Sequence, residues 1–140
     1  MAQTASGMEL SEIGIFSELS KRELKAVSRL MTEVELKEGS ILTRQGEPGR
    51  EFMIISSGRA SVEIDGKEIA ELFGGDFLGE LAVISGTPRV ATVTAKTAMV
   101  VEVLNRREFM ALMDESPKLS RKILVGAVKR LQQNERIKTN

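Results

Sequence analysis

The sequence predicts an α+β domain: an antiparallel β-roll or jelly roll of about eight strands, with an N-terminal helical segment, a short internal helix and two C-terminal helices. Three observations support this fold class. Apolar residues at helical spacing occur near the two ends of the chain. Between them, short β-type runs alternate with turn residues at close intervals. The length of 140 residues suits one domain with a single hydrophobic core.

The N-terminal part, residues 8–31, is predicted to be helical, after a loose, small and polar stretch at residues 1–7. A short helical piece is expected at 8–14. A longer helix is predicted after Ser20, a favoured N-cap residue, with Glu23 at the capping-box position. The apolar face of this helix carries Leu24, Val27, Leu30 and Met31.

The β-roll is predicted at residues 32–104, where seven runs have β-type composition. The runs lie at 33–36, 40–44, 52–56, 60–64, 67–72, 91–95 and 99–104. Asp65-Gly66 separates two of them and is a strong signal for a two-residue hairpin. So many short strands in one block are typical of a jelly roll or a related β-roll.

Two helices are predicted at 105–138. Asn105 and Glu108 form a capping-box pattern, and Ser116-Pro117 is typical of the N-cap and first residue of a longer last helix. The apolar residues of that helix recur every four positions and are Leu119, Ile123, Ala127 and Leu131, with Leu124 and Val128 broadening the stripe. Residues 8–140 are therefore predicted to form one domain.

Composition excludes several classes of function. The 20 basic and 20 acidic residues balance, so the chain has no overall field that would attract nucleic acid or an anionic membrane. It contains no cysteine and no histidine, which removes disulfides, thiolate nucleophiles and the commonest metal ligands. We expect no metal site and no catalytic residues. No apolar run approaches the roughly 18 residues of a membrane span, and we expect a cytoplasmic protein.

The stretch GELAVISGTPRVA, residues 79–91, contains one acid and one arginine around apolar sequence. Gly79 opens a predicted helical turn whose backbone N–H groups could hold an anion, and Arg89 offers a planar fork of donors suited to phosphate. Glu80 would repel a phosphate, unless it accepts a hydrogen bond from a hydroxyl of the attached sugar. Alternatively, Glu80 favours the helix dipole and forms an ordinary ion pair with Arg89. Spacing alone favours this alternative.

The same region, residues 75–91, resembles the phosphate-binding cassette of the cyclic nucleotide-binding domain family. The family pattern is apolar-Gly-Glu-x-small-apolar, then five or more residues, then Arg-x-Ala, and it is matched at 78–83 and 89–91. A second family pattern, Gly-acid-x-small followed by four apolar residues and a later glycine, is matched within 46–58. The resemblance covers nearly the whole chain and favours the nucleotide interpretation.

The resemblance implies a role for each matched residue. The phosphate-binding positions are Gly79, Leu81, Ala82, Arg89 and Val90, and the ribose 2′-hydroxyl position is Glu80. The purine would lie against the roll and under the last helix, at positions shared with the family's cAMP-binding activator proteins: Val62, Ile69, Ala70, Arg130 and Asn134. Plain core packing remains an alternative for Val62 and Ile69, and a solvated basic face for Arg130.

Two departures from the family bear on the base. Val90 stands where Ser, Thr or Ala is usual, and it lacks the hydroxyl that in this family often supports cGMP. Asn134 stands where the activator proteins have a threonine, and its amide can pair with the amino edge of adenine. Both departures favour cAMP, with cGMP as a weaker ligand.

We therefore expect a cyclic nucleotide sensor or regulatory domain and not an enzyme. Binding in the cassette would reposition the last helix as a lid and signal to an unknown effector. One alternative is an orphan β-roll that no longer binds nucleotide and acts through protein contacts. The other is a metal-dependent enzyme of the cupin type, which the absence of histidine disfavours.

The last helix could also contact a partner. Between Lys118 and Lys138 it has seven basic residues and one acid, Glu135, which is more typical of a solvated face than of a nucleic-acid interface. Its apolar stripe could pack partly on a second copy of the chain, giving a homodimer. The sequence continues into no further module after Asn140, so we expect a stand-alone sensor or a regulatory fragment.

Overall fold

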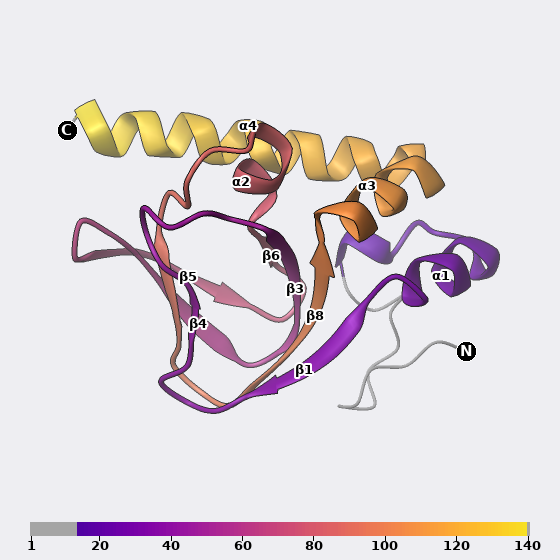
Figure 1. The fold of residues 1–140 in the computed structure, drawn as a ribbon, viewed down its shortest axis with the longest axis horizontal. Helices are drawn as coiled ribbons and strands as arrows, with labels where there is room; N and C mark the ends of the chain where they lie inside the picture. Colours follow the sequence, from indigo (N-terminus) through magenta and orange to yellow (C-terminus); the bar gives the residue numbers. More distant parts are fainter. Residues whose placement is uncertain (1–13, 140) are drawn as a thin grey trace.

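Two four-stranded antiparallel sheets form the β-roll (Figure 1). The computed structural model describes residues 14–139, with side-chain surroundings for residues 15–133. The first sheet has the order β1 (Thr32–Leu36), β8 (Met99–Asn105), β3 (Glu51–Ser57) and β6 (Phe77–Leu78). The second has the order β2 (Ile41–Thr43), β7 (Thr92–Ala95), β4 (Arg59–Ile64) and β5 (Lys67–Phe73).

The helices pack against the first sheet and across the roll. They are the 3₁₀ turn η2 (Gly14–Phe16) and the helices α1 (Lys21–Ser28), α2 (Glu80–Ser85), α3 (Arg106–Glu115) and α4 (Pro117–Thr139). Both predicted capping boxes are present, at Ser20 with Glu23 and at Asn105 with Glu108. Ser116 caps α4 through a hydrogen bond from the Leu119 amide. In Figure 1, α4 runs along the roll with α2 beneath it.

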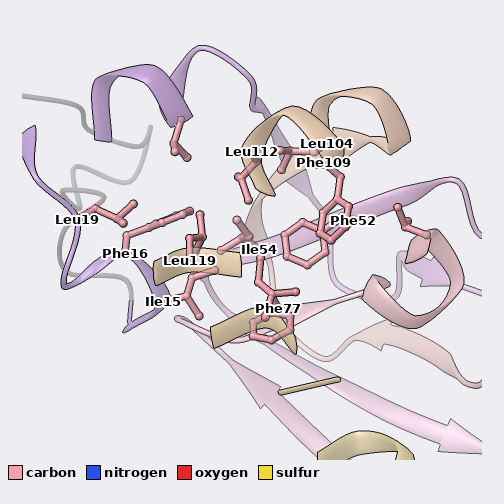
Figure 2. Close-up of a cluster of buried hydrophobic side chains, with 13 residues drawn as sticks. Ile15, Phe16, Leu19, Phe52, Ile54, Phe77, Leu104, Phe109, Leu112 and Leu119 are labelled. Atoms are coloured by element: carbon pink, nitrogen blue, oxygen red, sulfur yellow. The ribbon is translucent and has the colours of Figure 1, made fainter. Parts of the chain in front are cut away.

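Strand β3 separates two hydrophobic cores, which explains its continuous apolar sequence. Phe52 and Ile54 face a cluster formed with the helices, whereas Met53 and Ile55 face the interior of the roll. A strand that is buried on both faces shows no alternation of apolar and polar residues. The cluster on the helix side includes four phenylalanines (Figure 2), and the Phe52 ring lies 4.7 Å from that of Phe109 and 5.6 Å from that of Phe77.

The sequence misses one strand, β6. The other seven strands lie within two residues of their predicted bounds. β6 has only two residues, too few to show any periodicity, and it exists because Met53 and Ile54 of β3 pair with Leu78 and Phe77. The predicted loose stretch at 1–7 and most of the predicted helical piece at 8–14 lie outside the described residues.

The apolar stripe predicted for α4 is only partly buried. Leu119, Ile123 and Ala127 are buried, whereas Leu131 is 51% exposed. Leu124 and Val128, which were expected to broaden the stripe, are also exposed. None of the helices in the described part of the chain has the length and apolar character needed to cross a membrane.

Candidate functional site

A cavity lies between the second sheet, the start of α2 and the underside of α4. Ten of the residues singled out from the sequence line it: Val62, Ile69, Ala70, Gly79, Glu80, Leu81, Ala82, Arg89, Val90 and Arg130. The apolar lining comes mainly from strands, and the charged groups come from α2, α4 and the loop before β7. The side chain of Asn134 lies outside the described residues.

The cavity also has lining residues that the sequence analysis missed: Thr43, Ile64, Leu72, Leu78, Ala91, Val93 and Gln133. Two of these had a usable signal, because Ile64 and Leu72 each lie two positions from a predicted lining residue on the same strand face. A shift of register between Val62 and Glu63 leaves Ile69 unpaired in β5. A bulge of this kind can re-aim side chains, and both Ile69 and Ala70 line the cavity.

The N-terminus of α2 opens onto this cavity. Gly79 precedes it with φ of 91°, a left-handed conformation that favours glycine, and no side chain of the described residues caps the helix. The first backbone bond of the turn runs from the Val83 N–H to the Gly79 carbonyl, which leaves the earlier N–H groups without a partner in the helix. A Cβ at position 79 would lie 2.5 Å from Nη1 of Arg89, so the arginine packs directly on this glycine.

Arg89 is 9% exposed and only partly hydrogen-bonded. Its Nη2 donates to the Glu51 carbonyl at 2.8 Å, and its Nη1 is buried with no partner among the described residues. Burial lowers the pKa of the Arg89 guanidinium, and the nearby carboxylates of Glu51 and Glu80 oppose this effect. The side chain therefore keeps unused donor capacity beside the uncapped start of α2, which suits an anion.

Glu80 is 1% exposed and is held by Arg130 of α4. Nη1 of Arg130 lies 2.6 and 2.8 Å from the two carboxylate oxygens. Nη2 of the same arginine donates to the Phe77 carbonyl, and its guanidinium lies 4.8 Å from the centre of the Phe77 ring. The alternative of an ordinary ion pair between Glu80 and Arg89 is wrong for the described chain, because Glu80 pairs with Arg130 instead.

Arg130, Val62 and Ile69, for which the sequence left a structural role open, all line the cavity. Arg130 lies in the cavity wall and bonds to Glu80, so it is not part of a purely solvated basic face. Val62 and Ile69 are partly exposed residues of the cavity wall, although Val62 also packs against the core inside the roll. No sequence pattern joins Glu80 to Arg130, because the contact requires the fold to bring α4 over α2.

The sequence model of the cyclic nucleotide-binding domain family matches residues 33–116 of this chain. A curated relative, the cAMP-dependent protein kinase regulatory subunit of Schizosaccharomyces pombe, is 36% identical over 113 residues. The match covers 80% of this chain and 27% of that protein, so this chain spans about a quarter of the relative's length.

Solved structures of this family have the same fold. One, described as Sp-2Cl-cAMPS bound to PKAR CBD2, has a TM-score of 0.77 and 29% identity, covering 89% of this chain and 83% of that one. Another is the regulatory subunit of a cAMP-independent protein kinase A from Trypanosoma brucei, with a TM-score of 0.75, 28% identity and coverage of 93% and 46%. The chain therefore belongs to the cyclic nucleotide-binding domain family.

Proposed function

We propose that this chain is a cytoplasmic sensor domain that binds a cyclic nucleotide, favours cAMP over cGMP and regulates an effector without catalysing a reaction. The observation that carries the proposal is Arg89, whose buried Nη1 has no partner among the described residues and lies beside the start of α2, which no described side chain caps. A buried donor of this kind is costly unless a ligand satisfies it. A cyclic phosphate supplies the charge and the acceptor oxygens that both features need.

In this proposal the cavity divides into three parts. The phosphate lies at Gly79, Leu81, Ala82, Arg89 and Val90, and the purine lies on the strand residues Val62, Ile69 and Ala70. Glu80 accepts the ribose 2′-hydroxyl. A carboxylate has about four acceptor sites on its two oxygens, so Glu80 can accept this bond while Arg130 remains in place.

Membership in the cyclic nucleotide-binding domain family supports a cyclic nucleotide as the ligand class. The similar solved structures include a regulatory domain with a bound cAMP analogue and a kinase regulatory subunit described as cAMP-independent. Members of this fold therefore differ in their response to cAMP, and the residues that line each cavity determine whether the nucleotide binds. Here Glu80 and Arg89 are both present and both line the cavity, which favours a sensor over an orphan β-roll.

The preference for cAMP is proposed from Val90 and Asn134. Val90 is 43% exposed beside the cavity and offers no hydroxyl to a guanine. Asn134 has an amide that can pair with adenine. A lost polar contact of this kind costs about 1 to 3 kcal/mol, so we expect a ten- to hundredfold preference.

The proposed output is movement of α4 as a lid. Arg130 ties α4 to Glu80, the residue proposed to hold the ribose, so ligand binding and the position of α4 share one side chain. A ligand that favours the closed position shifts the equilibrium of the helix by its difference in affinity for the two states. The similar kinase regulatory subunit suggests a protein kinase as the effector class.

A second copy of the chain is the proposed partner of the outer face of α4. Among the residues of α4 up to Gln133, whose side chains are described, four large apolar residues are exposed: Leu124, Val125, Val128 and Leu131, each between 48% and 53%. Adjacent apolar residues of this number on one helix are a common feature of protein interfaces. We propose that they form a homodimer contact.

Isothermal titration calorimetry with cAMP and cGMP, on wild type and on Arg89→Ala, tests the ligand. We expect binding of cAMP, and a loss on substitution of about 1.5 to 3 kcal/mol, roughly ten- to hundredfold in affinity. Arg44→Ala, an exposed arginine outside this cavity, is the matched control. Absence of heat with either nucleotide at millimolar concentration would favour the orphan β-roll. Equal affinity of Arg89→Ala and wild type would refute the phosphate site.

A further inference from the structure

We propose that Gly126 is a positioning residue: its missing side chain lets α4 seat deeply enough on Phe77 for Arg130 to reach Glu80. This role of Gly126 adds a structural detail to the lid movement of α4 proposed above. Only the expected effect of Gly126 on nucleotide binding rests on that proposed function. The contact between α4 and the cassette is made by protein residues alone, so its main test is independent of nucleotide.

The backbone of α4 lies directly against the Phe77 ring at Gly126. A Cβ built on Gly126 would lie 2.6 Å from Cζ of Phe77, and 3.4 and 3.5 Å from its two Cε atoms. Real Cβ atoms do not approach other atoms this closely, so any other residue at 126 requires the helix or the ring to move. The ring has little room to retreat, because Phe77 is 8% exposed and packs on Phe52.

Arg130 lies one helical turn beyond Gly126, on the same face of α4. Its guanidinium lies over the Phe77 ring and donates to the Phe77 carbonyl as well as to Glu80. Phe77 is therefore held by α4 at two points, the backbone at Gly126 and the side chain of Arg130. How closely the helix backbone approaches Phe77 at Gly126 therefore determines whether the Arg130 side chain can reach Glu80.

The distances indicate that the fit has little tolerance. To bring a Cβ at 126 from 2.6 Å to an ordinary contact of 3.4 Å, α4 would have to withdraw by about 0.8 Å. The bonds from Arg130 to Glu80 measure 2.6 and 2.8 Å, and the same withdrawal takes them past about 3.2 Å, where such bonds weaken.

If Gly126 positions α4, replacing it with alanine should weaken the contact between Arg130 and Glu80. Helix propensity alone predicts that the same substitution is favourable. Glycine is among the least favourable residues inside a helix, and alanine is the most favourable. If Gly126 had no role in seating, Gly126→Ala would stabilise the protein and leave the contact between Arg130 and Glu80 intact. The two interpretations therefore differ in sign, which makes the position suitable for a test.

The experiment is a double-mutant cycle of Glu80→Gln and Arg130→Gln, measured by urea unfolding without nucleotide. The cycle is run in the wild-type background and again in the presence of Gly126→Ala, with Gly126→Ser as a second variant. Arg121→Ala, at an exposed position of the same helix, is the matched control. Rescue is tested by adding Phe77→Leu to Gly126→Ala, because leucine lacks the ring atom that a Cβ would meet.

We expect the cycle to show a coupling of about tenfold in the folding equilibrium constant in wild type and in Arg121→Ala. The coupling should vanish with Gly126→Ala or Gly126→Ser and return in part with Phe77→Leu. Full coupling in both variants at position 126, or loss without rescue, would overturn the proposal. In calorimetry with cAMP, Gly126→Ala should bind about tenfold more weakly than wild type. If wild type itself binds no nucleotide, the proposed ligand fails while the coupling result for Gly126 still stands.

Discussion

Arg130 on α4 and Glu80 on α2 are 50 residues apart in sequence and share two hydrogen bonds of 2.6 and 2.8 Å. The carboxylate is almost completely buried, whereas the guanidinium is partly exposed along the wall of the cavity. The pair is the direct chemical link between the helix proposed as a lid and the residue proposed to hold the ribose. Its energetic importance can be measured without any ligand.

We predict that Arg130→Gln destabilises the protein by about 1.5 to 3 kcal/mol, the usual contribution of a hydrogen bond to a charged group. The physical reason is that the substitution leaves the buried Glu80 carboxylate without its cationic partner. Urea unfolding measures the loss. Arg121→Gln, at an exposed arginine of the same helix, should change stability by less than about 0.5 kcal/mol. Similar losses in the two variants would show that the pair contributes little.

We predict that Val90→Thr increases affinity for cGMP by about tenfold and leaves affinity for cAMP nearly unchanged, since the new hydroxyl can satisfy a polar group of guanine. Val90 is 43% exposed, so the substitution should have little effect on folding. Calorimetry with both nucleotides provides the measurement. Val90→Ala, which shortens the side chain without adding a hydroxyl, should not gain cGMP affinity, and an equal gain in both variants would contradict the prediction.

We predict that the apolar face of α4 makes the protein dimeric in solution and that Leu124→Lys with Val128→Lys makes it monomeric. Both residues are about half exposed, and a charge at each would oppose burial in an interface. Sedimentation velocity over a range of concentrations measures the state. Ile41→Lys, at an apolar residue of β2 that is 42% exposed, is the control and should remain dimeric. A monomeric wild type would refute the dimer.

The fold was largely predictable because its signals are local. The capping boxes at Ser20 and Asn105 and the hairpin at Asp65-Gly66 each depend on a few adjacent residues, and all three are present. Asp65 and Gly66 have positive φ values of 53° and 80°, as a tight hairpin turn requires. Strand β6 was not predictable, because it depends on pairing with β3 and not on its own two residues.

The candidate site was predictable in its residues but not in its contacts. The cassette motif identified Glu80 and Arg89, yet their partners, Arg130 and the Glu51 carbonyl, lie 50 and 38 residues away. Spacing within the motif suggested that Glu80 and Arg89 pair with each other. In the structure, Glu80 instead pairs with Arg130 of α4, and Arg89 donates to the Glu51 carbonyl. Such choices depend on how distant elements pack, and local sequence does not encode them.

Glu102 gives a last prediction, on the pH dependence of stability. It is 5% exposed on β8 and lies opposite Glu33 of β1. Burial, and then the charge of Glu33 and a hydrogen bond with it, raise the pKa of Glu102 from 4.5 to about 7. Because the pKa is raised by folding, the protonated carboxyl stabilises the fold, and this stability is fully present below about pH 4.5 and is lost as the pH rises to about 7.

We expect wild type to lose on the order of 2 kcal/mol of unfolding free energy from this group between those two pH values. Glu102→Gln, which keeps the shape and stays neutral, should remove this dependence and be more stable than wild type at pH values above about 7. Urea unfolding at a series of pH values gives both curves. Glu35→Gln, at an exposed carboxylate on β1, should follow the wild-type curve. If Glu102→Gln and wild type instead ran parallel across this interval, the buried carboxyl of Glu102 would not titrate there.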